Sequence, residues 1–446
     1  MSNILIKDAT IVTMNREDRV IRRGYVRIEE DRIVEVGRAS GLKGGGAELV
    51  LDGNGQALLP GLISGHTHSG LTLLRGFGEG LDPDKLWETW LWPYERALRG
   101  KDSYASAQLT CLELIKSGVT CFADMHFNME SVAQAVRDSG LRASLSVAMM
   151  DSETAPITAD RSTRENEELV RRWHGKAEGR ISCMFGPCTV RTASRELFLK
   201  AREMADRYGV GLHIHLSETS RDVQHTVGRY GVRPVKYLHS LGILGEDVLA
   251  AHCVHLDREE TELLKQSRTN PIHNPSCNAK TGVGMAPVAE MLAKGINVGL
   301  GLDAAVCNDS LDMFREMKVG CLLQSVAEGR SYGGILATEA LRMCTVNNAL
   351  ALGLGDAIGS VEVGKKADLI LVDLVQPHMT PLVWGQTSNL VSNLVYSATG
   401  RDVTTVIVDG TMLMRERIVS SLDERAVVEK AGETLERVLS RAGLKP

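Results

Sequence analysis

The sequence predicts a (β/α)8 barrel joined to a composite β-sandwich domain, and two observations support this prediction. From about residue 57 to residue 302, eight apolar runs of strand length alternate with longer helical patterns. Short strand patterns lie on both sides of this stretch, which indicates that the two termini build one β domain together. We therefore expect the sandwich at residues 1–57 and 358–446 and the barrel at 58–357. A doubly wound open sheet fits the alternation as well.

The chain begins with short alternating or β-branched runs, which predict a small antiparallel sheet. These runs are Ile4–Met14, Gly24–Glu29 and Arg32–Gly37, and a hairpin turn joins the last two.

The barrel strands are predicted where apolar and β-branched residues run together. They are Ala57–Ser64, Thr120–Met125, Ala143–Met149, Ile181–Phe185, Val210–Leu216, Val248–Cys253, Thr269–His273 and Asn297–Leu302. The helical patterns between them are Tyr104–Ser117, Met129–Ser139, Arg195–Tyr208, Pro234–Leu241, Glu259–Gln266 and Pro287–Lys294. After the eighth run come helical patterns at Leu311–Glu328 and Ala337–Leu352, strand patterns at Val361–Glu362, Ala367–Val372, Thr404–Val408 and Thr411–Met414, and a closing helix at about Glu424–Ala442.

The composition excludes several classes of protein. With 446 residues, of which 43% are hydrophobic, the chain can bury a large core. Its net charge of −5, with both signs mixed along the chain, leaves no basic stripe for nucleic acid or an anionic membrane. No apolar run reaches the roughly 18 residues of a membrane helix. The first residues lack the pattern of a signal peptide, so we expect a cytoplasmic protein. A homo-oligomer is compatible with the sequence.

The cysteines predict free thiols. There are nine, an odd number, scattered along the chain without a CxxC pair. This pattern argues against a disulfide framework and a zinc ribbon, and it favours a reducing compartment.

Two histidines follow the first predicted barrel strand at alternating positions. Because side chains alternate across a strand, His66 and His68 leave it on the same side. Two imidazoles on one face can bind a metal ion, but they leave its coordination shell incomplete. Unless further ligands come from elsewhere in the chain, two hydrogen-bonded histidines without a metal are the commoner arrangement.

Other candidate ligands end predicted strands at the carboxyl-terminal mouth of the barrel, where active sites of this fold lie. His215 lies later in its strand than His213, so we expect His215 at the mouth and His213 as a buried, hydrogen-bonded core residue. His252 closes its apolar run and should also face the site. Asp303 points inward together with two glycines, which leave space below its carboxylate.

Histidine and aspartate side chains from several strands are ligands suited to zinc or ferrous iron. We expect one divalent ion with an open place for water, whose pKa falls to about 7 on such an ion. Glu218, in the loop after His215, is placed to move protons to the substrate and to the leaving group. Asp303 can accept the proton of the water, and His252 can orient the attacking hydroxide.

These residues lie in motifs that resemble the amidohydrolase superfamily from end to end. The motifs are HTH after strand one, HxHxxE in strand five, AHCVH in strand six and GLGLDAAVCND in strand eight, with LPGLISGHTH, HNPSCN, GVGMAPV and GSVEVGKKADLI around them. They are similar to the mononuclear deaminase branch, which includes 5-methylthioadenosine/S-adenosylhomocysteine deaminases and triazine hydrolases. The resemblance implies one ion, with zinc ahead of iron, bound by His66, His68, His215 and Asp303. Strand four has no lysine that could bridge a second ion.

The resemblance also implies residues that bind the substrate. Glu95 matches the acid that binds a nucleoside ribose in adenosine-type deaminases. Trp87 belongs to an aromatic cluster that forms either a packed subdomain edge or a pocket wall.

Three sites depart from the family pattern, one of which is Leu302–Asp303–Ala304 in place of the usual Thr-Asp-Gly of strand eight. Cys188 stands where the family has a substrate-binding histidine, and an expected arginine is replaced near Val147. Arg161, Arg164 or Arg191 could supply compensating contacts to the substrate.

Together these features predict a hydrolytic deaminase of an amino-substituted N-heterocycle. Adenosine-type substrates lead, followed by pterins, guanine-like bases and s-triazines, from which the same machinery could also expel chloride or an alkylamine. A hypothesis of another class is a metal-binding barrel without catalysis, against which Glu218 and His252 argue. The expected partners are a small heterocyclic substrate and water.

Overall fold

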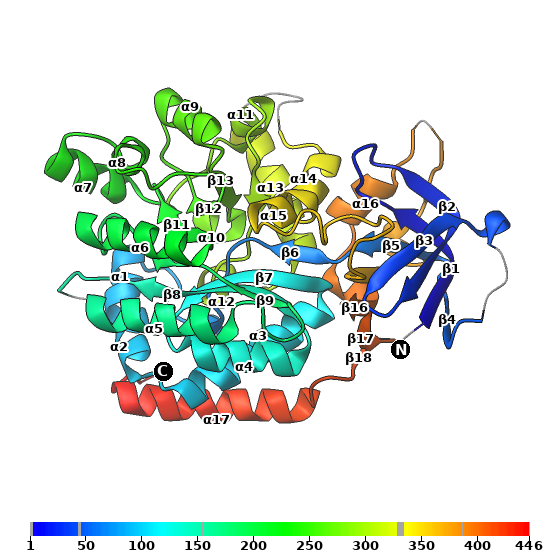
Figure 1. The fold of residues 1–446 in the computed structure, drawn as a ribbon, viewed down its shortest axis with the longest axis horizontal. Coiled ribbons are helices and arrows are strands. Elements are labelled where there is room, and N and C mark those ends of the chain that lie inside the picture. The colour runs from blue at the N-terminus through cyan, green and yellow to red at the C-terminus, as the bar shows by residue number, and fades with distance from the viewer. Residues whose placement is uncertain (1–2, 43–45, 154, 328–333, 386, 446) are drawn as a thin grey trace.

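A computed structural model describes residues 3–42, 46–153, 155–327, 334–385 and 387–445. Within these ranges, parallel strands follow one another around a barrel (Figure 1). They are β6 (Leu62–Ser64), β7 (Val119–His126), β8 (Arg142–Met149), β9 (Ile181–Cys183) with β10 (Gly186–Pro187), β11 (Leu212–Leu216), β12 (Val248–His252), β13 (Asn270–His273) and β14 (Gly299–Leu300). Parallel bridges from Phe185 to Leu212 and from Thr67 to Asp303 connect the two parts of this sheet. The chain therefore closes into the predicted (β/α)8 barrel, and the open sheet is wrong.

Helices cover the outside of the barrel and its mouth. The segments before β7 are η2 (Ser69–Leu74), α1 (Pro83–Leu86), η3 (Trp87–Leu91), α2 (Trp92–Ala97) and α3 (Gly100–Lys116). The helices between the later strands are α4 (Met129–Ser139), α5 (Ala159–Trp173), α6 (Arg195–Tyr208), α7 (Ser220–Tyr230), α8 (Pro234–Ser240), α9 (Arg258–Ser267), α10 (Pro275–Lys280) and α11 (Val288–Ala293). Those after β14 are α12 (Ala305–Asn308), α13 (Met313–Ala327), α14 (Ala337–Met343), α15 (Val346–Ala351), α16 (Leu390–Tyr396) and α17 (Glu424–Ala442).

Local sequence signals explain where these helices begin and end. The side chain of Ser194 accepts a hydrogen bond from the Leu197 N–H and caps the start of α6. Gly209, with φ of 66°, ends the same helix in the left-handed conformation that glycine adopts without strain. These signals explain why the predicted bounds of α6 agree with the structure.

The first predicted barrel strand is two strands. Within the run Ala57–Ser64, β5 (Gln56–Pro60) belongs to the terminal sheet, and only β6 belongs to the barrel. Gly61 separates them, because its N–H donates to the Asp368 carbonyl at 2.9 Å and a Cβ there would lie 2.1 Å from Thr120 Oγ1. A continuous apolar run gives no sign of such a change of sheet.

Two other predicted elements differ. Val361–Glu362 is not a strand. The helical pattern Ala337–Leu352 forms two helices, α14 and α15, because the chain turns at Cys344 and Thr345.

The two termini form a single nine-stranded sheet, as the prediction of a composite β domain requires. Its strands are β1 (Asn3–Val12), β2 (Val20–Glu29), β3 (Arg32–Arg38), β4 (Leu49–Asp52), β5, β15 (Leu369–Asp373), β16 (Val403–Val408), β17 (Thr411–Arg415) and β18 (Ile418–Val419). Antiparallel pairing of β15 with β5 joins the two halves, with Leu369 opposite Pro60. Ile6, Ile28 and Leu371 are buried in its core.

The carboxyl-terminal helix α17 leaves this sheet and packs along α3 on the outside of the barrel (Figure 1). Among the described residues, none of the helices is both long and apolar enough to span a membrane.

Candidate metal centre and active site

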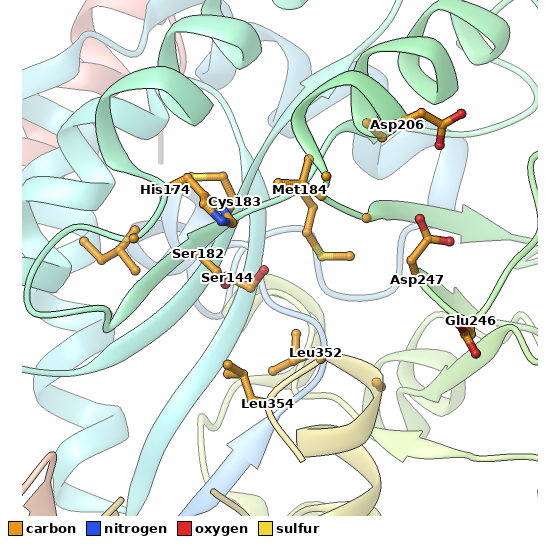
Figure 2. A pocket seen from close by; sticks show the side chains of 18 of the residues that line it. Ser144, His174, Ser182, Cys183, Met184, Asp206, Glu246, Asp247, Leu352 and Leu354 are labelled. Carbon is orange, nitrogen blue, oxygen red and sulfur yellow. The ribbon is translucent and has the colours of Figure 1, made fainter. Parts of the chain in front are cut away.

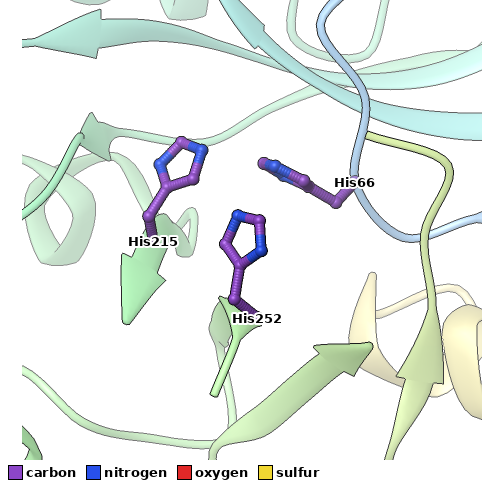
Figure 3. A group of neighbouring side chains, drawn as sticks. All are labelled: His66, His215 and His252. Carbon is purple, nitrogen blue, oxygen red and sulfur yellow. The ribbon is translucent and has the colours of Figure 1, made fainter. Parts of the chain in front are cut away.

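Five of the predicted site residues converge at the carboxyl-terminal mouth of the barrel. His66 and His68 follow β6, His215 lies in β11, His252 ends β12, and Asp303 follows β14. Figure 3 shows the imidazoles of His66, His215 and His252 turned toward one another from separate strands. Two groups, His66 with His215 and His252 and His66 with His68 and Asp303, each have all their ligand atoms within 4.8 Å of one another. The mouth therefore concentrates nitrogen and oxygen donors around one point.

The backbone around these residues permits this convergence. The N–H of Gly65 donates to the Leu300 carbonyl at 2.9 Å, and a Cβ on Gly65 would lie 2.6 Å from Asn348 Oδ1. His252 and Asp303 have φ of 75° and 59°, a left-handed conformation that is uncommon for residues other than glycine. Conformations of this kind gather at functional sites, where the surrounding structure holds a side chain in an unusual direction.

His68 and His215 each have one ring nitrogen turned away from the centre. Nδ1 of His68 lies 2.5 Å from the Met125 carbonyl, and Nδ1 of His215 lies 3.1 Å from the Cys188 carbonyl. A carbonyl oxygen only accepts, so both Nδ1 atoms donate and both Nε2 atoms present lone pairs. These two Nε2 atoms lie 3.2 Å apart, which is a stable arrangement only with a cation or proton between them.

His66 completes the evidence for a metal ion. Its Nε2 is buried and has no hydrogen-bond partner within the described part of the chain. This atom lies 3.8 Å from Asp303 Oδ1, and Nε2 of His68 lies 3.5 Å from the same oxygen. Burial and the neighbouring imidazoles hold the pKa of His66 and of His215 well below the usual value, so both rings are neutral. Imidazole nitrogens and a carboxylate oxygen are the donor set of a divalent cation, and Nδ1 atoms that donate to carbonyls turn the Nε2 lone pairs toward it.

His213 lies behind this group, where the sequence predicted a buried core residue. It is 0% exposed, and its Nε2 lies 2.8 Å from Nδ1 of His66. It therefore orients the His66 ring instead of facing the mouth.

Glu218 and His252 lie next to the donor group. Glu218 Oε2 is 3.8 Å from His252 Nε2, and Asp303 Oδ2 is 3.6 Å from the same nitrogen. Burial raises the pKa of the Glu218 carboxyl, so it holds a proton more readily than an exposed glutamate. Nδ1 of His252 lies 2.9 Å from Asn278 Oδ1, which fixes the direction of the ring. The pair can therefore transfer protons beside the centre.

Two cavities meet at these residues. One of about 40 Å3 is lined by the metal-centre residues His68, His215, His252 and Asp303 together with Leu86, Cys277 and Cys307. A second, of about 200 Å3, is lined by Trp92, Met150, Cys188, Thr189, Arg191 and Asp222, among others. Trp87 and Glu218 line both, so the two cavities are adjacent. Segments η2, α1, η3 and α2 cover this mouth.

Some of the predicted substrate-binding residues line the two cavities, and others do not. Trp87, Cys188 and Glu218 line the cavities. Glu95 is buried behind them, with Oε1 3.1 Å from His126 Nε2. Arg161 lines neither cavity, because its side chain is 51% exposed on α5 and pairs with Glu165 at 2.6 Å.

Sequence reasoning missed several residues that support the site. Asn278 orients His252, and Asp84 on α1 pairs with Arg191 at 3.3 Å. Asn278 lies in the motif HNPSCN, which was noted only for its resemblance. Asp84 carries no signal in the sequence, because its partner lies more than a hundred positions away.

A larger cavity lies at the opposite end of the barrel. It measures about 900 Å3 and is lined by residues before or near the amino-terminal ends of several strands, including Ser144, Gly211 and Asp247 (Figure 2). The fold places chemistry at the other end of the strands, and the groups of donor atoms lie there too. The smaller cavities at the mouth are therefore the candidate active site.

Comparison with known proteins agrees with this site. The family model described as the amidohydrolase family matches residues 57–413, which is most of the chain. The chain belongs to the amidohydrolase family. It is therefore an enzyme of a hydrolase family whose members include the relatives described next.

Two relatives of this amidohydrolase cover nearly its whole length. A 5'-deoxyadenosine deaminase of Methanosarcina acetivorans is 42% identical over 442 residues, 99% of this chain and 100% of the relative. A 5-methylthioadenosine/S-adenosylhomocysteine deaminase of Moorella thermoacetica is 44% identical over 429 residues, 96% of this chain and 97% of the relative.

Solved structures match the whole amidohydrolase chain as well. An adenosine deaminase from Xanthomonas campestris with bound zinc has a TM-score of 0.92 at 28% identity, covering 98% of this chain and 99% of that one. An atrazine chlorohydrolase from Arthrobacter aurescens has a TM-score of 0.89 at 24% identity, covering 97% and 100%, and supports the fold alone. The donor set and the zinc in the first of these structures together support a divalent metal at the centre.

Proposed function

We propose that this amidohydrolase is a metal-dependent hydrolytic deaminase that releases ammonia from an adenosine-type nucleoside. One observation supports this most strongly. Relatives named as deaminases of 5'-deoxyadenosine or 5-methylthioadenosine and S-adenosylhomocysteine align over nearly the full length at 42–44% identity. The His/Asp donor group with Glu218 beside it is the site that such a reaction requires.

The proposed metal ligands are His66, His68, His215 and Asp303, with a single Zn2+ preferred over Fe2+. A cation bound there supplies a water molecule acidified to a pKa of about 7 and thus a nucleophile at neutral pH. The neutral rings of His66 and His215 and the outward-donating Nδ1 atoms support this assignment.

The other proposed roles are to transfer protons and to orient the attacking water. Glu218 holds a proton for a ring nitrogen of the purine and later passes a proton to the departing amine. Asp303 accepts a proton from the attacking water. His252, held by Asn278 at 2.9 Å, donates a hydrogen bond that orients that water.

We propose that the reacting edge of the purine enters the 40 Å3 cavity beside the donor group, while the rest of the nucleoside occupies the adjoining 200 Å3 cavity. Glu95 is the proposed ribose acceptor, because its Oε2 is buried without a hydrogen-bond partner among the described residues. Trp87, Trp92 and Met150 give the 200 Å3 cavity apolar walls. Cys188 lines the same cavity, and its carbonyl contacts Nδ1 of His215.

The charge of this cavity favours neutral substituents. Its one arginine, Arg191, already pairs with Asp84 at 3.3 Å and with Asp222 at 3.0 Å. A substrate carboxylate would have to displace one of these acids. We therefore expect 5'-deoxyadenosine or 5-methylthioadenosine to be better substrates than S-adenosylhomocysteine.

We also propose a cytoplasmic location. All nine cysteines are free and buried, as expected in a reducing compartment.

Ammonia release by protein of known metal content tests the proposal. The panel contains 5'-deoxyadenosine, 5-methylthioadenosine, S-adenosylhomocysteine, guanine, a pterin and an aminotriazine. We expect ammonia from the first three, fastest from the neutral pair. Chloride or alkylamine from a triazine, with no ammonia from any adenosine, would contradict the proposal.

A further inference from the structure

Two cysteines lie beside Asp303 at the mouth of the barrel. Cys277 is on α10 and Cys307 is on α12, and they are 3% and 5% exposed. Their Sγ atoms and a carboxylate oxygen of Asp303 all lie within 4.8 Å of one another. The two thiols are thus a paired group and not two isolated cysteines.

The surrounding structure holds this pair in place. Glu316 on α13 bridges the two helices, because Oε1 accepts from the Ser276 N–H at 2.9 Å and Oε2 accepts from Asn308 Nδ2 at 3.0 Å. Ser276 and Asn308 are the direct neighbours of the two cysteines. The Lys280 ammonium on α10 donates to the Val306 carbonyl at 3.1 Å and adds a second link. The thiols therefore stay together without any bond between them.

The distances suit a shared cation. In a tetrahedral zinc site, with Zn–S of about 2.3 Å and Zn–O of about 2.0–2.2 Å, neighbouring donors lie about 3.6–3.8 Å apart. The 4.8 Å limit on this group requires only small side-chain movements to reach that geometry. Thiolate sulfur is a soft ligand that selects zinc and similar ions over magnesium or calcium.

Asp303 can serve two ions at once. Its Oδ1 lies 3.8 Å from His66 Nε2 and 3.5 Å from His68 Nε2, its Oδ2 lies 3.6 Å from His252 Nε2, and one of these two oxygens also belongs to the group with the two sulfurs. The charge of a second dication is offset by the two thiolates that form when it binds and releases two protons. A fourth coordination place faces the cavity that both cysteines line.

We propose that Cys277, Cys307 and Asp303 form a second cation site, for a thiophilic divalent ion such as Zn2+ or Cd2+, adjacent to the first. Because Glu218 lines the same 40 Å3 cavity, an ion at this site occupies space that the substrate ring needs. The second ion is therefore an inhibitor that competes with the substrate. The competition rests on the proposed function, whereas the binding site itself does not.

Zinc stoichiometry and X-ray absorption test the site. Metal-free protein is saturated with Zn2+, separated from unbound ion and analysed for zinc per chain and for Zn–S scattering at about 2.3 Å. We expect Zn–S scattering in the wild-type protein and one more equivalent of zinc than in Cys277→Ser or Cys307→Ser. The control is Cys183→Ser, which removes a buried thiol that lines the cavity at the opposite end of the barrel and should keep both the scattering and the extra equivalent.

The wild-type measurement decides the question even if a variant does not fold. Absence of Zn–S scattering at saturation would overturn the site, as would equal zinc content in the wild type and both folded serine variants. In an active preparation, ammonia release should fall as the second equivalent binds, and unchanged release would overturn the competition with substrate. A protein that binds two ions through sulfur but deaminates nothing would contradict the proposed function and leave the site intact.

Discussion

The two ends of the barrel show that cavity size and chemistry are separate properties. At the amino-terminal end, a space of about 900 Å3 is bordered by charges that pair with one another, such as Arg202 with Asp247 at 2.8 Å. At the carboxyl-terminal end, a cavity of about 40 Å3 is surrounded by imidazoles and carboxylates, and the nearby His66 Nε2 has no partner among the described residues. Buried donor atoms without partners carry a free-energy cost that a bound ligand can offset, and the groups of possible metal ligands found among the described residues all lie at this end. They mark the functional end better than volume does.

The strongest test of this contrast exchanges the same residue type at each end. Glu218→Gln should lower ammonia release about 10²–10⁴-fold, because an amide cannot hold and release the proton. Zinc content should stay unchanged, since Glu218 is not a proposed ligand. The matched variant is Glu246→Gln in the 900 Å3 cavity. The side chain of Glu246 is 67% exposed and pairs with Arg268 at 2.9 Å.

Turnover of Glu246→Gln should remain within about twofold of wild type, as for most surface substitutions. Equal losses in both variants would remove the functional distinction between the two ends.

A smaller effect is expected from the asparagines of the two ends. Asn278→Ala should lower kcat about 10–100-fold with little change in KM, because His252 loses the hydrogen bond at 2.9 Å that orients it. The control is Asn270→Ala, which removes hydrogen bonds to the Glu246 and Val248 carbonyls at the other end. Asn270→Ala should lower the thermal midpoint and keep kcat, so a similar kcat in both variants would argue against an orienting role for Asn278.

The same contrast explains which features the sequence alone could predict. The strands β7, β8 and β12 agree with their predicted ranges to within a residue or so, because buried parallel strands are continuous apolar runs. The prediction of Ala57–Ser64 as one strand was wrong, because an apolar run that is buried in both sheets does not reveal the break at Gly61. Periodicity reports burial, and it does not report which sheet buries a residue.

For the site, alternation and strand position were enough to bring His215, His252 and Asp303 to one mouth. The cavity walls could not be predicted in this way. Arg161 lies on the exposed face of α5, a helix that none of the predicted patterns covered, so its side chain could not be placed relative to the mouth. The pairing of Cys277 with Cys307 depends on how α10 packs on α12, which no local pattern encodes.

At the mouth, the charges around the 200 Å3 cavity allow a test of selectivity between charged and neutral 5'-substituents. Asp84→Asn removes one of the two acids that pair with Arg191 and frees part of its charge. Because partly exposed ion pairs contribute about 0.2–1 kcal/mol, the ratio of kcat/KM for S-adenosylhomocysteine to that for 5-methylthioadenosine should rise about two- to fivefold. Steady-state kinetics with both substrates measure this ratio, and a fall in the ratio would show that Arg191 does not face the substituent.

The smallest effect on turnover is expected from the contact between α3 and α17, which lies outside the cavities at both ends of the barrel. Asp102 on α3 is 0% exposed and accepts from Arg437 at 2.9 Å and from Arg441 at 2.8 Å, both on α17. Burial raises the pKa of this carboxyl, but the hydrogen bonds from the two arginines outweigh it and leave the pKa below its usual value. The contact therefore stabilises the fold above about pH 4, the pKa region of an unfolded aspartate, and the stabilisation is lost as the pH falls through the lower folded-state pKa.

Asp102→Asn should accordingly lower the free energy of unfolding at pH 7 by about 1–3 kcal/mol, because two partly exposed arginines lose a buried acceptor. Denaturant unfolding at pH 7, 5 and 3.5 should show the variant and the wild type converging as the pH falls, while turnover at pH 7 stays within about twofold. Glu433→Gln, which removes an exposed acid paired with Lys430 on the same helix, is the control and should change the free energy of unfolding far less than Asp102→Asn does. A difference between Asp102→Asn and wild type that stays constant with pH would mean that the carboxyl charge does not hold α17, and that packing along α3 alone does.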